Sequence, residues 1–275
     1  MKKLLIFMLG LMIVLAFINT AGAGEASLRV VPDRIDIGPN FNGAELTITG
    51  DAPEGSDIYI KVSSPNDSVL HLSKKGKVGL FWMNVENTVV TSVPKLYRII
   101  SSAPFSRVPP ALQGELGISP DFSEIYTRSV VVKRSDKGPA RLAKEDAGKY
   151  IGALIDIYKD NGLYGVAENA VMARDGKFQA VVKLPPNIPQ EKCSVTVYAV
   201  REGKVAGTVS APFQVRGVGL VRWLGNEAIY NGPEYGFIAV LLALAFGTGI
   251  ALLFSFVENA INNGVKTGLN HGAGH

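Results

Sequence analysis

An uncharged apolar run near the carboxyl end constrains this chain more than any other feature. Gly236 to Val257 is 22 residues long and contains no Asp, Glu, Lys or Arg. A bilayer core about 30 Å thick needs about 20 apolar residues in an α-helix, so the run can span it with some tilt. We expect a transmembrane helix over 236–257, followed by a short tail over 258–275.

The N-terminus has the pattern of a secretory signal. Lys2 and Lys3 precede an apolar stretch, and Ala21-Gly22-Ala23 supplies small residues for cleavage. The alternative is an uncleaved anchor, although about 15 apolar residues are short for a span. A signal over 1–23 predicts that the following segment lies outside the cytoplasm and the tail inside.

Three aromatic residues, Trp223, Tyr230 and Tyr235, precede the span. Amphipathic rings favour the headgroup level of a bilayer, so we expect these residues to be membrane-interface anchors in a juxtamembrane segment. For Trp223, packing in the last strand of the soluble domain is the alternative.

The segment between signal and span has the composition of a folded domain. The chain is 47% hydrophobic and 19% charged, and its net charge of +4 is too balanced to indicate nucleic acid or an acidic surface as a partner. It has one cysteine, Cys193, so no intramolecular disulfide can form. Alternation in the run after Cys193 predicts a buried strand rather than a reactive thiol.

Short alternating runs separated by turn-forming residues predict an antiparallel sandwich in the first part of this segment. The expected strands are Leu28–Val31, Ala44–Thr49, Asp57–Val62 and Val78–Val85. The last of these presents Trp82 as a large core side chain. A turn is expected at Lys74–Lys77, before that strand.

The middle of the chain reads as helical. Ile151, Leu154, Ile155 and Tyr158 follow a helical period that Asn161-Gly162 should end. A weaker stripe lies upstream, and Gly138-Pro139 is expected to separate the two halves. It consists of Phe122, Ile125, Tyr126 and Ser129.

Strands resume after Val166, with tight turns at Asp175-Gly176 and Glu202-Gly203. They either form a second small sandwich or complete the first, and we favour two β units bridged by helices. The fold class is therefore mainly β with a helical insert (α+β), plus one C-terminal transmembrane helix. The expected segments are a signal (1–23), an N-terminal β-sandwich-like unit (24–105), a helical connection (106–165), a C-terminal β unit (166–220), a juxtamembrane segment (221–235), the span (236–257) and a cytoplasmic tail (258–275).

Several short motifs along the chain resemble a known family. They are Val31-Pro32-Asp33 with Ile35-Asp36-Ile37, the Gly-Leu-Phe-Trp-Met-Asn run from Gly79, Val93-Pro94 with Tyr97, Asn161-Gly162-Leu163-Tyr164 and the strand from Phe178 to Pro186. The chain resembles an uncharacterised family of putative transmembrane proteins described mainly from alphaproteobacteria. The resemblance implies a bacterial inner-membrane protein facing the periplasm, and it implies association with sulfite-exporter permeases of the TauE/SafE type.

Few residues along the chain could carry catalysis. His71 is the one histidine before the tail, and one Cys with one His cannot build a structural zinc site. No Ser sits in a nucleophile-elbow pattern. We expect no catalytic, cofactor-binding or metal-binding residues and no enzyme activity. His271 and His275 could hold a metal transiently, but a disordered Gly-rich tail is the preferred interpretation.

Lys74, Lys75 and Lys77 crowd one short segment. They could attract an anion such as sulfite or a phosphate headgroup, and the alternative is a solubilising hairpin tip.

The span itself carries the strongest functional pattern. Small side chains recur every four residues and form a ridge that allows close approach of another helix. The ridge consists of Ala239, Ala243, Gly247, Ala251 and Ser255.

Two functions follow from these patterns together with the resemblance, which supplies the inner-membrane location and the exporter as a partner. The first is a non-enzymatic, membrane-anchored periplasmic accessory protein. Its span packs against a membrane permease, such as a sulfite or organosulfur exporter, against a subunit of an envelope complex, or against its own copy. The alternative is a periplasmic module, tethered to the inner membrane, that binds or senses an anion or another ligand.

Overall fold

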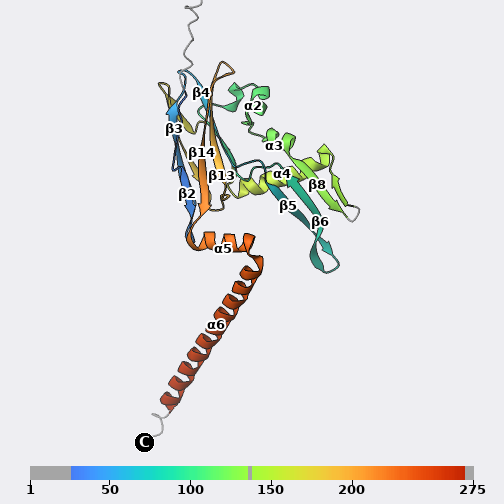
Figure 1. The fold of residues 1–275 in the computed structure, drawn as a ribbon, viewed down its shortest axis with the longest axis vertical. Coiled ribbons are helices and arrows are strands. Elements are labelled where there is room, and N and C mark those ends of the chain that lie inside the picture. Colours follow the sequence, from blue (N-terminus) through green and yellow to red (C-terminus); the bar gives the residue numbers. More distant parts are fainter. Residues whose placement is uncertain (1–25, 136–137, 270–275) are drawn as a thin grey trace, which may run out of the picture. The chain divides into compact units, whose positions relative to one another are not determined.

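The computed structural model describes residues 26–135 and 138–269 and divides them into two units (Figure 1). A strand-rich unit ends at Arg216, and a helical unit begins at Gly217. The signal predicted over 1–23 and the tail histidines His271 and His275 lie outside the described residues.

The described part of the strand-rich unit begins with seven strands, continues with helices that enclose a strand pair, and ends with five strands. In chain order they are β1 (Arg29–Val31), β2 (Arg34–Ile37), β3 (Ala44–Asp51), β4 (Asp57–Ser63), β5 (Val69–Val78), β6 (Phe81–Thr91), β7 (Tyr97–Ser101), the 3-10 helix η1 (Phe105–Arg107), α2 (Pro110–Leu116), α3 (Ser123–Arg128), β8 (Val130–Ser135), β9 (Gly138–Arg141), α4 (Lys144–Asp160), β10 (Tyr164–Ala167), β11 (Val171–Arg174), β12 (Lys177–Leu184), β13 (Lys192–Arg201) and β14 (Lys204–Gly217).

These strands form three sheets. Sheet A has the order β1-β3-β12-β11, sheet B the order β10-β7-β4-β13-β14-β2, and sheet C the order β5-β6-β8-β9. All the pairings described are antiparallel except that of β10 with β7, which is parallel. The mainly β fold with helices and one C-terminal apolar helix is confirmed.

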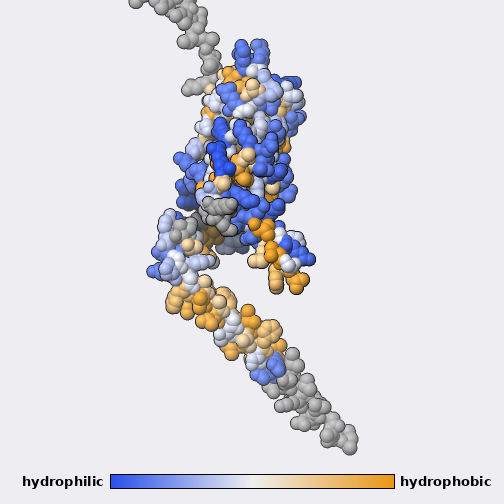
Figure 2. All heavy atoms as spheres, turned by 90° about the vertical axis from the view of Figure 1, so that its right-hand side faces the viewer, coloured by the Kyte–Doolittle hydropathy of each residue, from blue (hydrophilic) through white to orange (hydrophobic). Residues whose placement is uncertain are grey.

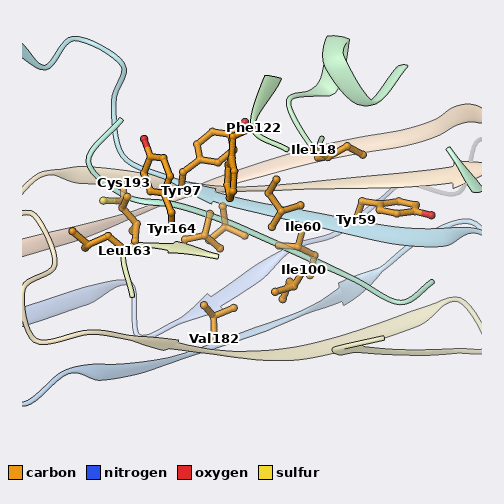
Figure 3. Packing of buried hydrophobic residues seen from close by; sticks show 14 of the residues in the cluster. Tyr59, Ile60, Tyr97, Ile100, Ile118, Phe122, Leu163, Tyr164, Val182 and Cys193 are labelled. Atoms are coloured by element: carbon orange, nitrogen blue, oxygen red, sulfur yellow. The ribbon is translucent and has the colours of Figure 1, made fainter. Parts of the chain in front are cut away.

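The central strands of sheet B, β7, β4 and β13, are largely buried on both faces. One face carries Ile60 and Val195 toward sheet A, and the other carries Tyr59 and Tyr97 toward the short helices. In Figure 3, Val182 of β12 lies on one side of the central strands, and Phe122 and Ile118 lie on the other. The core is thus continuous from sheet A through sheet B to the helices, as expected for layers that each have an apolar side.

The two β units favoured from the sequence are instead joined in shared sheets. Strand β12 pairs with β3 from Lys177–Asp51 to Leu184–Ala44, and β13 pairs with β4 from Ser194–Ser63 to Val200–Asp57. Two short hairpins alone are marginally stable in water. The strands after residue 166 therefore join sheets that contain strands from the first third of the chain. Sequence periodicity identifies strands but not the strands with which they pair. The predicted separate β units, 24–105 and 166–220, therefore share one core.

The prediction of one continuous strand over Val78–Val85 is wrong. The turn falls inside it, at Gly79 and Leu80, and connects β5 to β6. Gly79 has a φ of +62°, which glycine adopts without steric cost. Trp82, expected in the core, is 70% exposed near the tip of this hairpin. The turn expected at Lys74–Lys77 is strand β5.

Other local predictions are confirmed. Helix α4 buries Ile151, Leu154 and Ile155 and ends at Asn161, with Gly162 at a φ of +70°. The turns at Asp175-Gly176 and Glu202-Gly203 connect β11 to β12 and β13 to β14. The predicted separator Gly138-Pro139 instead begins β9, which pairs with β8 between the helices.

The helical unit consists of α5 (Gly219–Tyr230) and α6 (Gly232–Leu269). Helix α6 has 38 residues and is therefore about 57 Å long at 1.5 Å per residue. Figure 2 shows the span as a mostly hydrophobic rod. The helix extends past the predicted span and ends at Leu269, within the segment that the sequence predicts as the tail.

Candidate membrane-anchoring and partner-contact sites

Helix α6 has the length and composition of a membrane span. The candidate span covers Gly232–Asn259, and its most apolar window is not buried within the chain. A core helix of a soluble protein of this composition would be covered by other elements. An α-helix also satisfies its own backbone hydrogen bonds, as lipid requires. The predicted transmembrane helix is therefore confirmed as an apolar helix that can cross a bilayer.

The small-residue row lies within this continuous helix. Its members are Ala239, Ala243, Gly247, Ala251 and Ser255, and all are exposed. No other described residue comes within 4 Å of a Cβ added at Gly247. Positions four apart lie on one inclined row of a helix surface, which turns slowly around the axis. The row is thus open, and its role in helix packing stays a prediction.

The aromatic residues before the span lie on helices. Trp223 is part of α5, whereas β14 ends at Gly217, so the alternative of a last-strand position is wrong. Tyr230 ends α5, and Tyr235 lies in the first turn of α6. Asn231 links the helices, because its amide N–H donates to Glu227 O and its carbonyl accepts from Tyr235 N–H, at 3.0 and 2.9 Å. Their role as interface anchors stays a prediction.

The three lysines proposed as an anion site do not all face one way. Alternation along β5 places Lys74 on the face of Leu72, and it places Lys75 and Lys77 on the opposite face. Lys74 is opposite Glu86 of β6. The geometry therefore does not gather the three ammonium groups around one anion.

Glu86 anchors the root of the β5–β6 hairpin, a feature with no signal in the sequence. Tyr150 of α4 donates its hydroxyl to Glu86 Oε2 at 2.5 Å, and Lys133 Nζ of β8 lies 3.1 Å from Glu86 Oε1. The hydrogen bond from Tyr150, with that from Lys133 second, holds the pKa of Glu86 below its ordinary value of 4.5. This cluster connects three elements that are separate in the sequence.

The groups with the most perturbed acidity are buried in the core. Burial raises the pKa of Cys193 to about 12 and that of Tyr59 to about 12. The Cys193 thiol is 1% exposed, which confirms the predicted buried strand cysteine. Tyr164, whose pKa burial also raises, donates its hydroxyl to Pro94 O at 2.6 Å. All three groups belong to the buried core cluster.

The described residues offer little that could hold a metal or activate a nucleophile. They contain no group of three or more His, Cys, Asp and Glu side chains in metal-binding geometry. A hollow of about 530 Å³ over sheet A is lined by Asp51 and Lys177, which pair at 3.2 Å, but by no His or Cys. His71 is exposed on β5. The absence of enzyme activity stays a prediction.

Comparison with known proteins identifies the family to which the chain belongs. Searches of curated proteins and of solved structures found no match. One family model, described as "Putative transmembrane protein (Alph_Pro_TM)", matches residues 26–255, which include the whole strand-rich unit from β1 onward, α5 and most of the apolar span. The chain therefore belongs to this family of transmembrane proteins.

Proposed function

We propose that this protein is a non-enzymatic accessory protein of the bacterial inner membrane. Its strand-rich unit faces the periplasm, and α6 packs against a helix of a membrane partner. That partner is a permease, with a sulfite or organosulfur exporter as the first candidate, a subunit of an envelope complex, or a second copy of this chain.

The open small-residue row of α6 carries this proposal. In lipid, the hydrophobic effect does not drive helices together, so association depends on close packing and hydrogen bonds. Small side chains permit the backbones to approach, and rows with a spacing of four favour right-handed crossings near −40°. Nothing else in the described part of the helical unit covers the row. A partner helix would supply the missing contacts.

The orientation is supported by the signal pattern of the N-terminus. A secretory signal over 1–23 would carry the following unit across the membrane until α6 stops transfer. The size of the strand-rich unit agrees with this order, because long segments translocate largely regardless of their charge. A reporter fused after the last residue should be active in the cytoplasm and inactive in the periplasm.

Crosslinking within native membranes tests the packing. In a Cys193→Ser background, Ala243→Cys places a thiol in the row. Leu252→Cys places one on the side opposite Ala243, because nine residues at about 100° each make about two and a half turns. We expect Ala243→Cys to capture a partner helix and Leu252→Cys to capture none. Mass spectrometry of the product then separates a permease from a dimer of this chain.

A bulky substitution in the small-residue row provides a second test of the packing. Gly247→Leu should lower the Ala243→Cys product at least tenfold, whereas Leu253→Ile should leave it unchanged. Equal products from Ala243→Cys and Leu252→Cys, or an undiminished product with Gly247→Leu, would remove the support for a packed row.

A further inference from the structure

The far part of the β5–β6 hairpin is a two-stranded ribbon that no other strand supports. Strand β8 pairs with β6 only from Asn87 to Thr91, and β5 is the edge of sheet C. From Lys74 to Glu86 the two strands therefore pair with each other alone. In Figure 1 the hairpin extends past β8. Isolated two-stranded hairpins are marginally stable in water.

The tip of this ribbon exposes large apolar side chains. Leu80, Phe81 and Trp82 are 88%, 72% and 70% exposed, and Val78, Met83 and Val85 are exposed as well. None of the six belongs to the core cluster or packs against it. Figure 2 shows a hydrophobic projection on the strand-rich unit. Burying one such side chain contributes about 1.5–3 kcal/mol, so six together are a strong driving force toward a second surface.

Exposed apolar side chains project from both faces of the tip. Alternation places Phe81 and Met83 on one face and Trp82 on the other, and Leu80 lies in the turn. A protein groove that received one face of a ribbon would leave the other in water. A fluid apolar medium that surrounds the tip satisfies both faces.

Basic residues flank the tip on the face of Trp82. Lys77 is opposite Trp82 and Lys75 is opposite Asn84, so they lie about 7 and 14 Å from Gly79 along the strand at 3.4 Å per residue. There is no acidic residue between Lys74 and Val85, and Glu86 is engaged by Lys133 and Tyr150. The long side chains of Lys75 and Lys77 can extend toward headgroup phosphates while the apolar tip beside them lies among acyl chains.

We propose that this hairpin tip is a second membrane contact, which inserts Leu80, Phe81 and Trp82 into the acyl boundary of a bilayer containing anionic lipid. Lys75 and Lys77 bind lipid phosphates at the headgroup level. Interfacial elements insert about 5–10 Å, which matches the depth of the apolar tip. The inference rests on the membrane anchor α6, which tethers the strand-rich unit to a bilayer, and not on the accessory function proposed above.

Fluorescence of the full chain in proteoliposomes tests this contact. Trp82 and Trp223 are the two tryptophans, so Trp223→Phe leaves Trp82 as the sole reporter. With about 30% phosphatidylglycerol in the bilayer, we expect brominated acyl chains to quench Trp82 and aqueous iodide to quench it little. The charge-reversing pair Lys75→Glu and Lys77→Glu, or a purely zwitterionic bilayer, should weaken insertion by roughly fivefold or more for each lysine.

A matched reporter provides the control. Met172 of β11 is also 70% exposed, so Met172→Trp with Trp82→Phe and Trp223→Phe reports on the body of the strand-rich unit. This reporter should stay open to iodide and unquenched by lipid. An unreactive Cys193 thiol verifies that each variant is folded.

Three outcomes overturn the proposal. The first is free access of iodide to Trp82 in anionic proteoliposomes. The second is equal lipid quenching at Trp82 and Met172→Trp, which would mean that the body contacts the bilayer without any special role for the hairpin. The third is a Trp82 that is shielded from iodide and from lipid quenchers in native membranes but is open to iodide in proteoliposomes of the purified chain, which would assign the tip to a protein partner.

Discussion

Gly117 closes helix α2 at a crowded point of the core. It is the C-cap of the helix, with a φ of +67°, and its N–H donates to Gln113 O. A Cβ added there would lie 1.6 Å from Glu124 Oε2 and 2.7 Å from the Tyr97 hydroxyl. The Tyr97 hydroxyl lies 2.5 Å from Gly117 O and also contacts the Glu124 carboxylate, whose Oε1 pairs with Arg128 at 2.9 Å.

Replacing this glycine should be costly. We expect Gly117→Ala to lower the free energy of unfolding by roughly 2–4 kcal/mol, since left-handed backbone costs an L residue about 1–2 kcal/mol and the overlap costs more. Gly148→Ala is the control, because nothing lies within 4 Å of its added Cβ inside α4, and it should stabilise by about 0.5–1 kcal/mol. Guanidinium unfolding of the full chain in detergent measures both. Equal effects would contradict the packing at Gly117.

At the scale of elements, the cluster around Glu86 fixes the root of the hairpin. Its folded pKa lies below 4.5, first because Tyr150 donates a hydrogen bond to the carboxylate. A depressed carboxyl pKa contributes stability above the ordinary value and loses it as pH falls through the folded pKa. The hold of α4 and β8 on the hairpin is therefore complete above pH 4.5 and weakens below it.

Amide exchange along β5 and β6 should show this pH dependence. In the wild-type chain, protection at the root should fall as pH drops below 4.5, after correction for the intrinsic exchange rate. Tyr150→Phe should lower protection at the root already at neutral pH and make its further loss below pH 4.5 smaller, because the folded pKa of Glu86 returns toward its ordinary value. Tyr126→Phe, an exposed tyrosine on α3, is the control and should leave the profile unchanged. Identical profiles for both variants would contradict the cluster.

Elements with a strong local signal could be predicted from the sequence. Helix α4 has a clear apolar period and a glycine just past its end, and the turn at Asp175-Gly176 has residues that tolerate positive φ. The β5–β6 hairpin could not be placed, because a run such as Val78–Val85 resembles a buried strand. Gly79 within it was the one local sign of a turn. Exposure of Trp82 depends on the absence of a covering element, which no local pattern reports.

At the scale of the whole molecule, the early and late strands form one core. Leu46 of β3 and Cys193 of β13 are separated by almost 150 positions in the sequence, yet both belong to the same buried cluster. The sequence could predict most of these strands but not this pairing, since partner choice is a property of the assembled sheets. The apolar helix α6 was predictable because length and composition alone define a candidate span.

Thiol labelling of Cys193 tests the single core. The buried thiol, with its pKa raised to about 12, should react only when the strand-rich unit unfolds. Leu46→Ala should lower the guanidinium midpoint of labelling by an amount that corresponds to about 2–5 kcal/mol. Val181→Ala, on the exposed side of β12, should change it by less than about 0.5 kcal/mol. An unchanged midpoint with Leu46→Ala would mean that the two halves unfold separately.

The insertion of β12 beside β3 and of β13 beside β4 has a consequence for biosynthesis. While the ribosome makes the first half, β3 and β4 lack these neighbours, and their free edges can pair with other nascent chains. The sheets close only when β14 has emerged, and α6 begins 15 residues after β14 ends. Synthesis of the last core strand and of the apolar helix α6 therefore nearly coincide, so β3 and β4 keep open edges until almost the whole chain has been made.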